Sequence, residues 1–264
     1  MKKFFVLCGT LALVGMMQAG ASAAEQAAKQ SGVYVAPKFV YGYTVMDKLK
    51  ASMDVVTPGV GGSVGVGSMS KDNNDDVFGG ALAIGYDFSK RYDLPIRAEL
   101  EYSIFSRAEG GLSEQVKLAG GVRVPTTLEQ ELNIQTLFAN VYYDITTGTP
   151  LTPYLGAGVG LAFIDADGDF TDNISVGGTN VPLTVDGGSK SNSNFAWNVG
   201  AGAAWAFTDN LSVDLGYRFA YLGEAKSGTM SVAAPALTNE SVNISGKTEN
   251  LYMHQVLLGL RYTF

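Results

Sequence analysis

The sequence predicts an all-β fold, an eight-stranded antiparallel up-and-down transmembrane β-barrel with four long extracellular loops. Three observations lead to this prediction. Apolar and polar residues alternate within eight segments, and the connections between the segments are alternately long and short. The chain also ends on LLGLRYTF at 257–264, where every second residue is apolar and the last is aromatic. Such an ending is typical of the closing strand of an outer-membrane barrel.

The N-terminal 23 residues have the pattern of a secretory signal peptide. Lys2 and Lys3 precede an apolar run, and Ala21-Ser22-Ala23 forms a small-residue cleavage site. The apolar run, about 14 residues long, is too short to cross a bilayer comfortably. The only cysteine, Cys8, lies within it, so we expect no disulfide in the mature chain.

The remaining chain is divided into a short N-terminal segment, 24–31, and a barrel, 32–264. Each predicted strand is long enough to cross the hydrocarbon core at a tilt of ~45°, which takes about 9–11 residues. Their number is even, as a closed bacterial barrel requires. In chain order the predicted strands are 32–43, 77–88, 96–106, 133–144, 153–164, 195–207, 211–221 and 251–264.

The connections indicate how the barrel would sit in the membrane. Short connections are expected to be periplasmic turns, and long ones extracellular loops. The short ones are 89–95, 145–152 and 208–210; the long ones are 44–76, 107–132, 165–194 and 222–250. We therefore expect a protein of the Gram-negative outer membrane whose loops face outward.

Aromatic residues gather at the strand ends, where barrels place their interfacial girdles. The lower ring is predicted to contain Tyr86, Phe88, Tyr143, Trp205, Phe207, Tyr262 and Phe264. The upper ring is predicted to contain Phe195, Trp197, Phe219, Tyr221 and Tyr252.

Charged residues on the opposite faces of the strands point to a filled lumen. By the two-residue alternation of the strands, four basic and five acidic side chains are predicted to point into the lumen. They are Lys38, Arg97, Arg218 and Arg261, with Asp87, Glu99, Glu101, Asp144 and Asp214. Buried charges are costly unless paired, so a nearly balanced set predicts a salt-bridged plug with a structural role. Seven glycines on this face would leave room for Tyr34, Phe138 and Tyr142.

The predicted loops are acidic. They hold 9 Lys or Arg and 17 Asp or Glu, which accounts for −8 of the −9 net charge that remains after residue 23. We expect such loops to repel nucleic acid and bare lipid A phosphates. Divalent cations or basic partner surfaces would be attracted.

Candidate chemistry is sparse. Asp165, Asp167, Asp169 and Asp172 resemble the start of a calcium loop, but the glycine and glutamate of an EF-hand are not at the required positions. They remain weak candidates for a metal site, and no cofactor is expected. His254 is the only histidine, and strand parity places it on the lipid face without a nearby serine and acid.

Several segments resemble the small outer-membrane β-barrel family, which includes opacity-type proteins, major surface antigens and the barrel of outer membrane protein A. The segments are YVAPKFVYGY at 34–43, IRAELEYS at 96–103, NVYYDI at 140–145, PYLGAGVGLA at 153–162, AGAAWAFTDNLSVDLGYRF at 201–219 and the terminal LLGLRYTF. The resemblance implies insertion by the barrel assembly machinery through a signal formed by Leu258, Leu260, Tyr262 and Phe264. It implies no residue-by-residue functional site. No peptidoglycan-binding domain is expected after Phe264.

Three functional hypotheses follow. The leading one is a non-catalytic barrel that displays acidic extracellular loops for surface interaction, adhesion or envelope integrity. Its expected partners are outer-membrane lipid and lipopolysaccharide, the barrel assembly machinery and host or neighbouring-cell surface molecules. The alternative is a small-conductance, porin-like channel through gaps beside the lumen glycines. The third is a lipid-modifying or proteolytic outer-membrane enzyme that depends on His254.

Overall fold

The computed structural model describes most of the predicted barrel. The predicted signal peptide and all but the last residue of the 24–31 segment lie outside the described residues. These are 31–56, 63–117, 123–171, 174–176, 179–181, 184–233 and 241–264.

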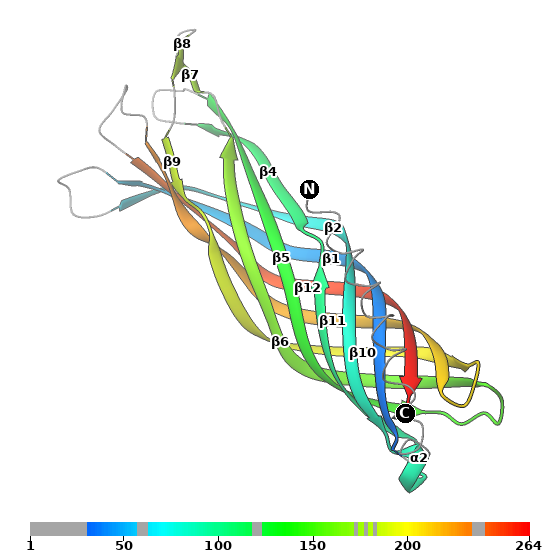
Figure 1. The fold of residues 1–264 in the computed structure, drawn as a ribbon. Helices are drawn as coiled ribbons and strands as arrows, with labels where there is room; N and C mark the ends of the chain where they lie inside the picture. The colour runs from blue at the N-terminus through cyan, green and yellow to red at the C-terminus, as the bar shows by residue number, and fades with distance from the viewer. Residues whose placement is uncertain are drawn as a thin grey trace, which may run out of the picture.

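Antiparallel strands form a closed barrel (Figure 1). The long strands are β1 (Val33–Val56), β2 (Ser63–Asp87), β5 (Arg123–Asp144), β6 (Leu151–Thr171), β11 (Leu211–Ala233) and β12 (Ser241–Thr263). The wall is completed by β3 (Ile96–Phe105), β4 (Ala108–Lys117), β9 (Thr184–Gly187) and β10 (Lys190–Ala206). Pairing of β1 with β12 and of β10 with β11 closes the ring. The predicted eight-stranded antiparallel barrel is therefore confirmed.

Two of the eight wall strands are each built from two pieces. Both β3 and β4 pair with β5, and the break lies at Ser106 and Arg107. Both β9 and β10 pair with β11, and the break between them contains Gly188 at φ +119°. A separate hairpin of β7 (Ile174–Val176) and β8 (Thr179–Val181) precedes β9.

The prediction of four long loops was wrong in one respect: much of each predicted loop is strand. β1 and β2 stay paired from Thr44↔Asp75 to Val56↔Ser63, and β11 and β12 stay paired as far as Ala233↔Ser241. In these extensions, many of the positions that alternate outward hold polar residues. The loss of outward apolar residues therefore marks the end of the lipid contact and not the end of the strand.

The strands are about twice as long as the membrane requires. A strand of 24 residues, such as β1, that rises ~3.3 Å per residue at a tilt of ~45° extends ~55 Å along the barrel axis, against an apolar band of about 25 Å. About half of the barrel wall therefore lies beyond the bilayer, as four hairpins.

On the half of the barrel away from the hairpins, which we call the lower half, the outward face is apolar. Its exposed side chains include Leu82, Ile84, Leu100, Ile104, Val141, Leu155, Val159, Leu215, Val256, Leu258 and Leu260. Aromatic side chains lie in contact at its lower rim, where Tyr86 meets Phe88 at 4.8 Å and Tyr262 meets Phe264 at 5.1 Å between ring centroids. Among the described residues, no helix is long and apolar enough to cross a bilayer.

The end of the barrel opposite the hairpins has short connections. One of them contains α2 (Ser89–Tyr92), and the others are 145–150 and 207–210 (Figure 1). At this end the strand boundaries predicted from the sequence agree with the observed ones to within two residues. The last residue is held in the wall, because the Phe264 amide donates to Val33 O at 2.9 Å and Ser31 Oγ donates to Phe264 O at 2.6 Å.

Glycines inside the barrel make room for tyrosine rings from neighbouring strands. A Cβ added to Gly85 would collide with the ring of Tyr34, and one added to Gly156 would lie 2.5 Å from Tyr142 Cδ1. Side chains of both tyrosines point inward, and Tyr34 is fully buried. Glycine at these positions therefore allows bulky groups to fill a narrow lumen.

We predict that Gly85→Ala destabilises the barrel by about 1–3 kcal/mol, because the new methyl group overlaps the buried Tyr34 ring and the Ala98 carbonyl oxygen. Urea unfolding in lipid vesicles measures the change. Gly80→Ala is the matched control on the same strand, since nothing lies within 4 Å of an added Cβ there. Equal stability of the two variants would contradict the steric argument.

Candidate functional site: the charged lumen and the hairpin end

The interior of the barrel contains two layers. Ionic side chains fill the half near the short connections, and apolar side chains fill the half toward the hairpins. The order of residues along β1 shows the change, since Tyr34 and Lys38 belong to the first layer and Met46 to the second.

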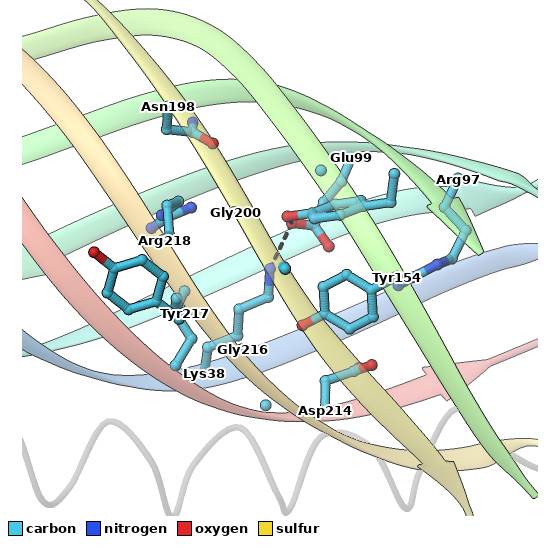
Figure 2. Close-up of a pocket in the computed structure, with 15 residues that line it drawn as sticks. Lys38, Arg97, Glu99, Tyr154, Asn198, Gly200, Asp214, Gly216, Tyr217 and Arg218 are labelled. Atoms are coloured by element: carbon cyan, nitrogen blue, oxygen red, sulfur yellow. Dashed lines mark hydrogen bonds and ion pairs between the residues drawn. The ribbon is translucent and has the colours of Figure 1, made fainter. Parts of the chain in front are cut away.

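A chain of ion pairs crosses the lumen at mid-height. Lys38 Nζ lies 2.5 Å from Glu99 Oε1 and 2.6 Å from Glu101 Oε2. The other oxygen of Glu101 lies 2.7 Å from Arg218 Nη1. The chain thus joins β1, β3 and β11, which are separated by other strands in the wall (Figure 2 shows Lys38, Glu99 and Arg218).

Neutral polar groups complete this chain. Glu99 accepts hydrogen bonds from Tyr34 Oη at 3.1 Å and Tyr142 Oη at 3.2 Å. On the other side, Arg218 Nε donates to Gln255 Oε1 at 2.6 Å. Charges removed from water need such partners, so the arrangement meets the requirement for a buried ionic cluster.

Two further ion pairs lie closer to the short connections. Arg97 donates to both carboxylate oxygens of Asp144, at 2.7 and 2.8 Å. Arg261 Nε lies 3.2 Å from Asp214 Oδ2. Asp87 was predicted to belong to the lumen network, but it does not join these pairs. Its carboxylate instead accepts from the backbone N and the Oγ of Ser89, at 2.9 and 2.6 Å, and so stabilises the turn that begins α2.

A small cavity lies beside the ion pairs, against the glycine-rich wall of β6, β10, β11 and β12 (Figure 2). Its volume is about 40 Å³, enough for about three water molecules at ~10–15 Å³ each. Arg218 and Asn198 line it, and the buried Nη2 of Arg218 has no hydrogen-bond partner among the described residues. Water is the natural partner for such a group.

Apart from the inward position of Phe138, the apolar layer was not predicted from the sequence. Its large members are at most 1% exposed: Met46, Leu132, Ile134, Phe138, Ile164, Leu222, Leu251 and Met253. Three of them, Met46, Leu132 and Leu222, lie in segments predicted to be loops. The available signal was the continued two-residue spacing of Leu132 with Ile134 and of Leu251 with Met253.

Three of the four weak metal candidates, Asp165, Asp167 and Asp169, lie on a strand rather than in a loop. Residues 165–171 belong to β6, and Asp165 and Asp167 flank the inward-facing Ala166 and point outward. The side chain of Asp169 and the whole of Asp172 lie outside the described part of the chain. Within the described residues, no group of three or more potential ligands is close enough to hold a metal ion.

His254 lies on the outward face, as its parity predicts. Its Nδ1 is 2.7 Å from Tyr217 Oη, and its ring contacts Phe219 at 5.2 Å between centroids. These neighbours include neither a serine nor a carboxylate, the partners that a hydrolytic histidine requires.

Acidic side chains mark one side of the hairpin end. Outward-facing carboxylates from β2, β4, β5 and β6 are Asp76, Glu109, Glu131, Asp165 and Asp167. Arg107 pairs with Glu131 on this side. The acidic character expected of the hairpins is thus concentrated on these strands in the described part of the structure.

Comparisons with known proteins agree with this architecture. The family described as outer membrane protein beta-barrel domain matches residues 9–264. Outer membrane protein PagN of Salmonella typhimurium is 31% identical over 271 residues, which cover 100% of both chains. An uncharacterized protein of Brucella abortus is 29% identical over 199 residues, which cover 70% of this chain and 69% of that protein.

Among solved structures, Neisserial surface protein A is 18% identical, with a TM-score of 0.44 and coverage of 89% of this chain and 98% of that one. The family match over nearly the whole chain and the full-length similarity to PagN establish the classification. This chain belongs to the outer membrane protein beta-barrel domain family and is an outer-membrane protein of a Gram-negative bacterium.

Proposed function

We propose that this protein is a non-catalytic surface barrel whose hairpins project from the cell and contact basic surfaces of host or neighbouring cells, or support envelope integrity. The observation that carries the proposal is the length of the strands, which continue well beyond the apolar band. A filled lumen leaves the hairpin end as the part of the molecule that can meet a partner.

The orientation is part of the proposal. Short connections at one end and long hairpins at the other favour periplasmic turns and extracellular hairpins. Residues 1–23 would direct export. The outward-facing Leu258, Leu260, Tyr262 and Phe264 on and after β12 would form the signal read by the barrel assembly machinery.

We also propose that the barrel has no catalytic activity. His254 is the only histidine of the chain. Its hydrogen bond to Tyr217 on the lipid face supports an interfacial role for the imidazole.

The second candidate function is a small channel, which the polar cavity beside Lys38 and Arg218 favours. Two features oppose it. Ion pairs fill the cross-section beside the cavity, and the apolar layer above it contains side chains that exclude water. An ion would have to leave the polar cavity and enter a closed apolar region, so we favour a plug.

We also propose that the ionic chain holds the barrel together. Glu101 is fully buried and links Lys38 to Arg218, which come from two other strands, and together with Glu99 it balances their two positive charges. Loss of this carboxylate would leave an unpaired charge inside a closed wall.

We predict that neutralising the acidic side of the hairpins reduces surface contact. In Asp76→Asn/Glu109→Gln/Asp165→Asn/Asp167→Asn, adhesion of displaying bacteria to an epithelial monolayer should fall about tenfold, because charge complementarity directs the encounter. Resistance of the cells to detergent is scored in parallel. Asp93→Asn/Asp209→Asn, at the short-connection end, is the control. If adhesion and detergent resistance both match the wild type, the proposed role is wrong.

We predict no reproducible unitary conductance for the wild-type protein in planar bilayers, because the apolar layer interrupts any water path. A known porin recorded in the same bilayer verifies the sensitivity of the measurement. Discrete current steps whose size changes in Glu99→Gln would support the channel instead.

We predict that Glu101→Ala lowers the free energy of unfolding by about 3–5 kcal/mol, because Arg218 loses its counter-ion in a buried site. Urea titration in lipid vesicles, followed by tryptophan fluorescence, gives the value. Glu249→Ala is the matched control, since its pair with Lys50 is partly exposed and should contribute less than about 1 kcal/mol. A Glu101→Ala effect no larger than that of the control would refute a structural role for the network.

A further inference from the structure

Three lysines form a row across the outward face of the hairpin end. Lys50 on β1 is the direct cross-strand neighbour of Lys247 on β12, which is in turn the neighbour of Lys226 on β11. These strands lie side by side in the wall (Figure 1). The side chains are 45%, 39% and 49% exposed, respectively, and therefore accessible. We call this set the lysine row.

Two glutamates pair with the lysine row and offset two of its three positive charges. Glu249 Oε1 lies 2.6 Å from Lys50 Nζ. A single oxygen of Glu224 is shared, at 3.1 Å from Lys226 Nζ and 3.4 Å from Lys247 Nζ. Hydrogen bonds from Lys226 and Lys247 lower the pKa of Glu224, so it stays ionised at neutral pH. The nearest further acid along β1, Asp47, accepts a hydrogen bond from Asn250 at 3.3 Å.

A cluster of aromatic rings lies on the same face, closer to the membrane. It is formed by Trp197, Phe219, Tyr221, Tyr252 and His254. Phe219 is stacked on Tyr252 with 5.7 Å between ring centroids, and the centroids of Tyr221 and Tyr252 are 5.4 Å apart. Rings of this kind sit at the headgroup level of a membrane. We call this set the aromatic platform.

The spacing between the two sets matches a membrane interface. Tyr252 and Tyr221 are each five residues from the lysine on their strand, Lys247 and Lys226. Five residues at ~3.3 Å each and a tilt of ~45° place the lysine row ~12 Å above the platform. The ammonium groups therefore lie just beyond the headgroup level.

The side of the hairpin end formed by β2, β4, β5 and β6 is acidic. The carboxylates on β2, β4, β5 and β6 described above would repel a phosphate, and Arg107 there is paired with Glu131. The net negative charge of the hairpins suggested that they would repel phosphorylated lipid everywhere. The lysine row shows that one face does not. One face, that of β1, β12 and β11, carries the cations.

We propose that this face is a docking site for lipopolysaccharide, in which phosphate groups of lipid A contact the lysine row while its sugars and upper acyl chains lie against the aromatic platform. Charge complementarity and the adjacent platform select this occupant, because it combines phosphates, sugars and acyl chains in one molecule. The inference rests on the proposed outward orientation of the hairpins. It concerns the lateral face of the wall and is independent of adhesion.

The test measures lipid retained by the purified, folded protein in native mass spectrometry. The probes are bisphosphorylated lipid A, monophosphorylated lipid A and phosphatidylethanolamine. We expect the wild type to retain bisphosphorylated lipid A most strongly and phosphatidylethanolamine least. Lys50→Gln/Lys226→Gln/Lys247→Gln should weaken lipid A retention about tenfold or more.

Two further variants make the outcome decisive. Lys90→Gln/Arg91→Gln/Arg107→Gln removes the same number of exposed charges elsewhere and should bind like the wild type. Lys226→Arg/Lys247→Arg keeps the charges and should retain binding even if the glutamine variant folds poorly. Equal retention by the glutamine variant and the wild type, equal losses in the two charge-removal variants, or loss of binding in the folded arginine variant would each overturn the proposal. Because binding is measured on purified protein, none of these results depends on the adhesion experiment.

Discussion

Closure of the wall is the constraint on which the rest of the structure depends. Inside a bilayer every backbone amide and carbonyl must find a partner within the protein, and a β-sheet achieves this only as a closed barrel. Here the pairing of β1 with β12 and of β10 with β11 removes the free edges. An eight-stranded closed wall leaves an interior that side chains can just fill. Glycines opposite Tyr34 and Tyr142 show how tightly that space is used.

The narrow interior is filled in two chemically different ways, and the difference limits function. Near the middle, Glu101 links Lys38 to Arg218 and ties distant strands together. Toward the hairpins, side chains such as Ile134 and Leu251 form a buried apolar layer. A small polar cavity lies beside the first layer and is separated from the hairpin end by the second. This arrangement supports a barrel whose interior serves stability and whose interactions take place on its outer surface.

The outer surface above the bilayer is itself divided. Because the strands continue past the membrane in regular pairing, side chains from distant parts of the sequence stand in rows. Acidic groups collect on β2, β4, β5 and β6, while Lys50, Lys226 and Lys247 share the opposite side. The overall charge of the hairpins conceals this separation. We propose that one side contacts basic partner surfaces and the other binds phosphorylated lipid.

The sequence by itself determined the fold class, the strand number and the strand boundaries at the short-connection end, because a lipid-facing strand must alternate with a period of two. Parity also identified inward residues such as Glu99 and Arg218. Tertiary structure decided what parity cannot express: which charges meet across the lumen, that Asp87 stabilises a turn, and that the strands extend far into the predicted loops. Partner choice depends on cross-strand register, and beyond the bilayer the outward residues face water, so the apolar half of the alternation pattern is lost there.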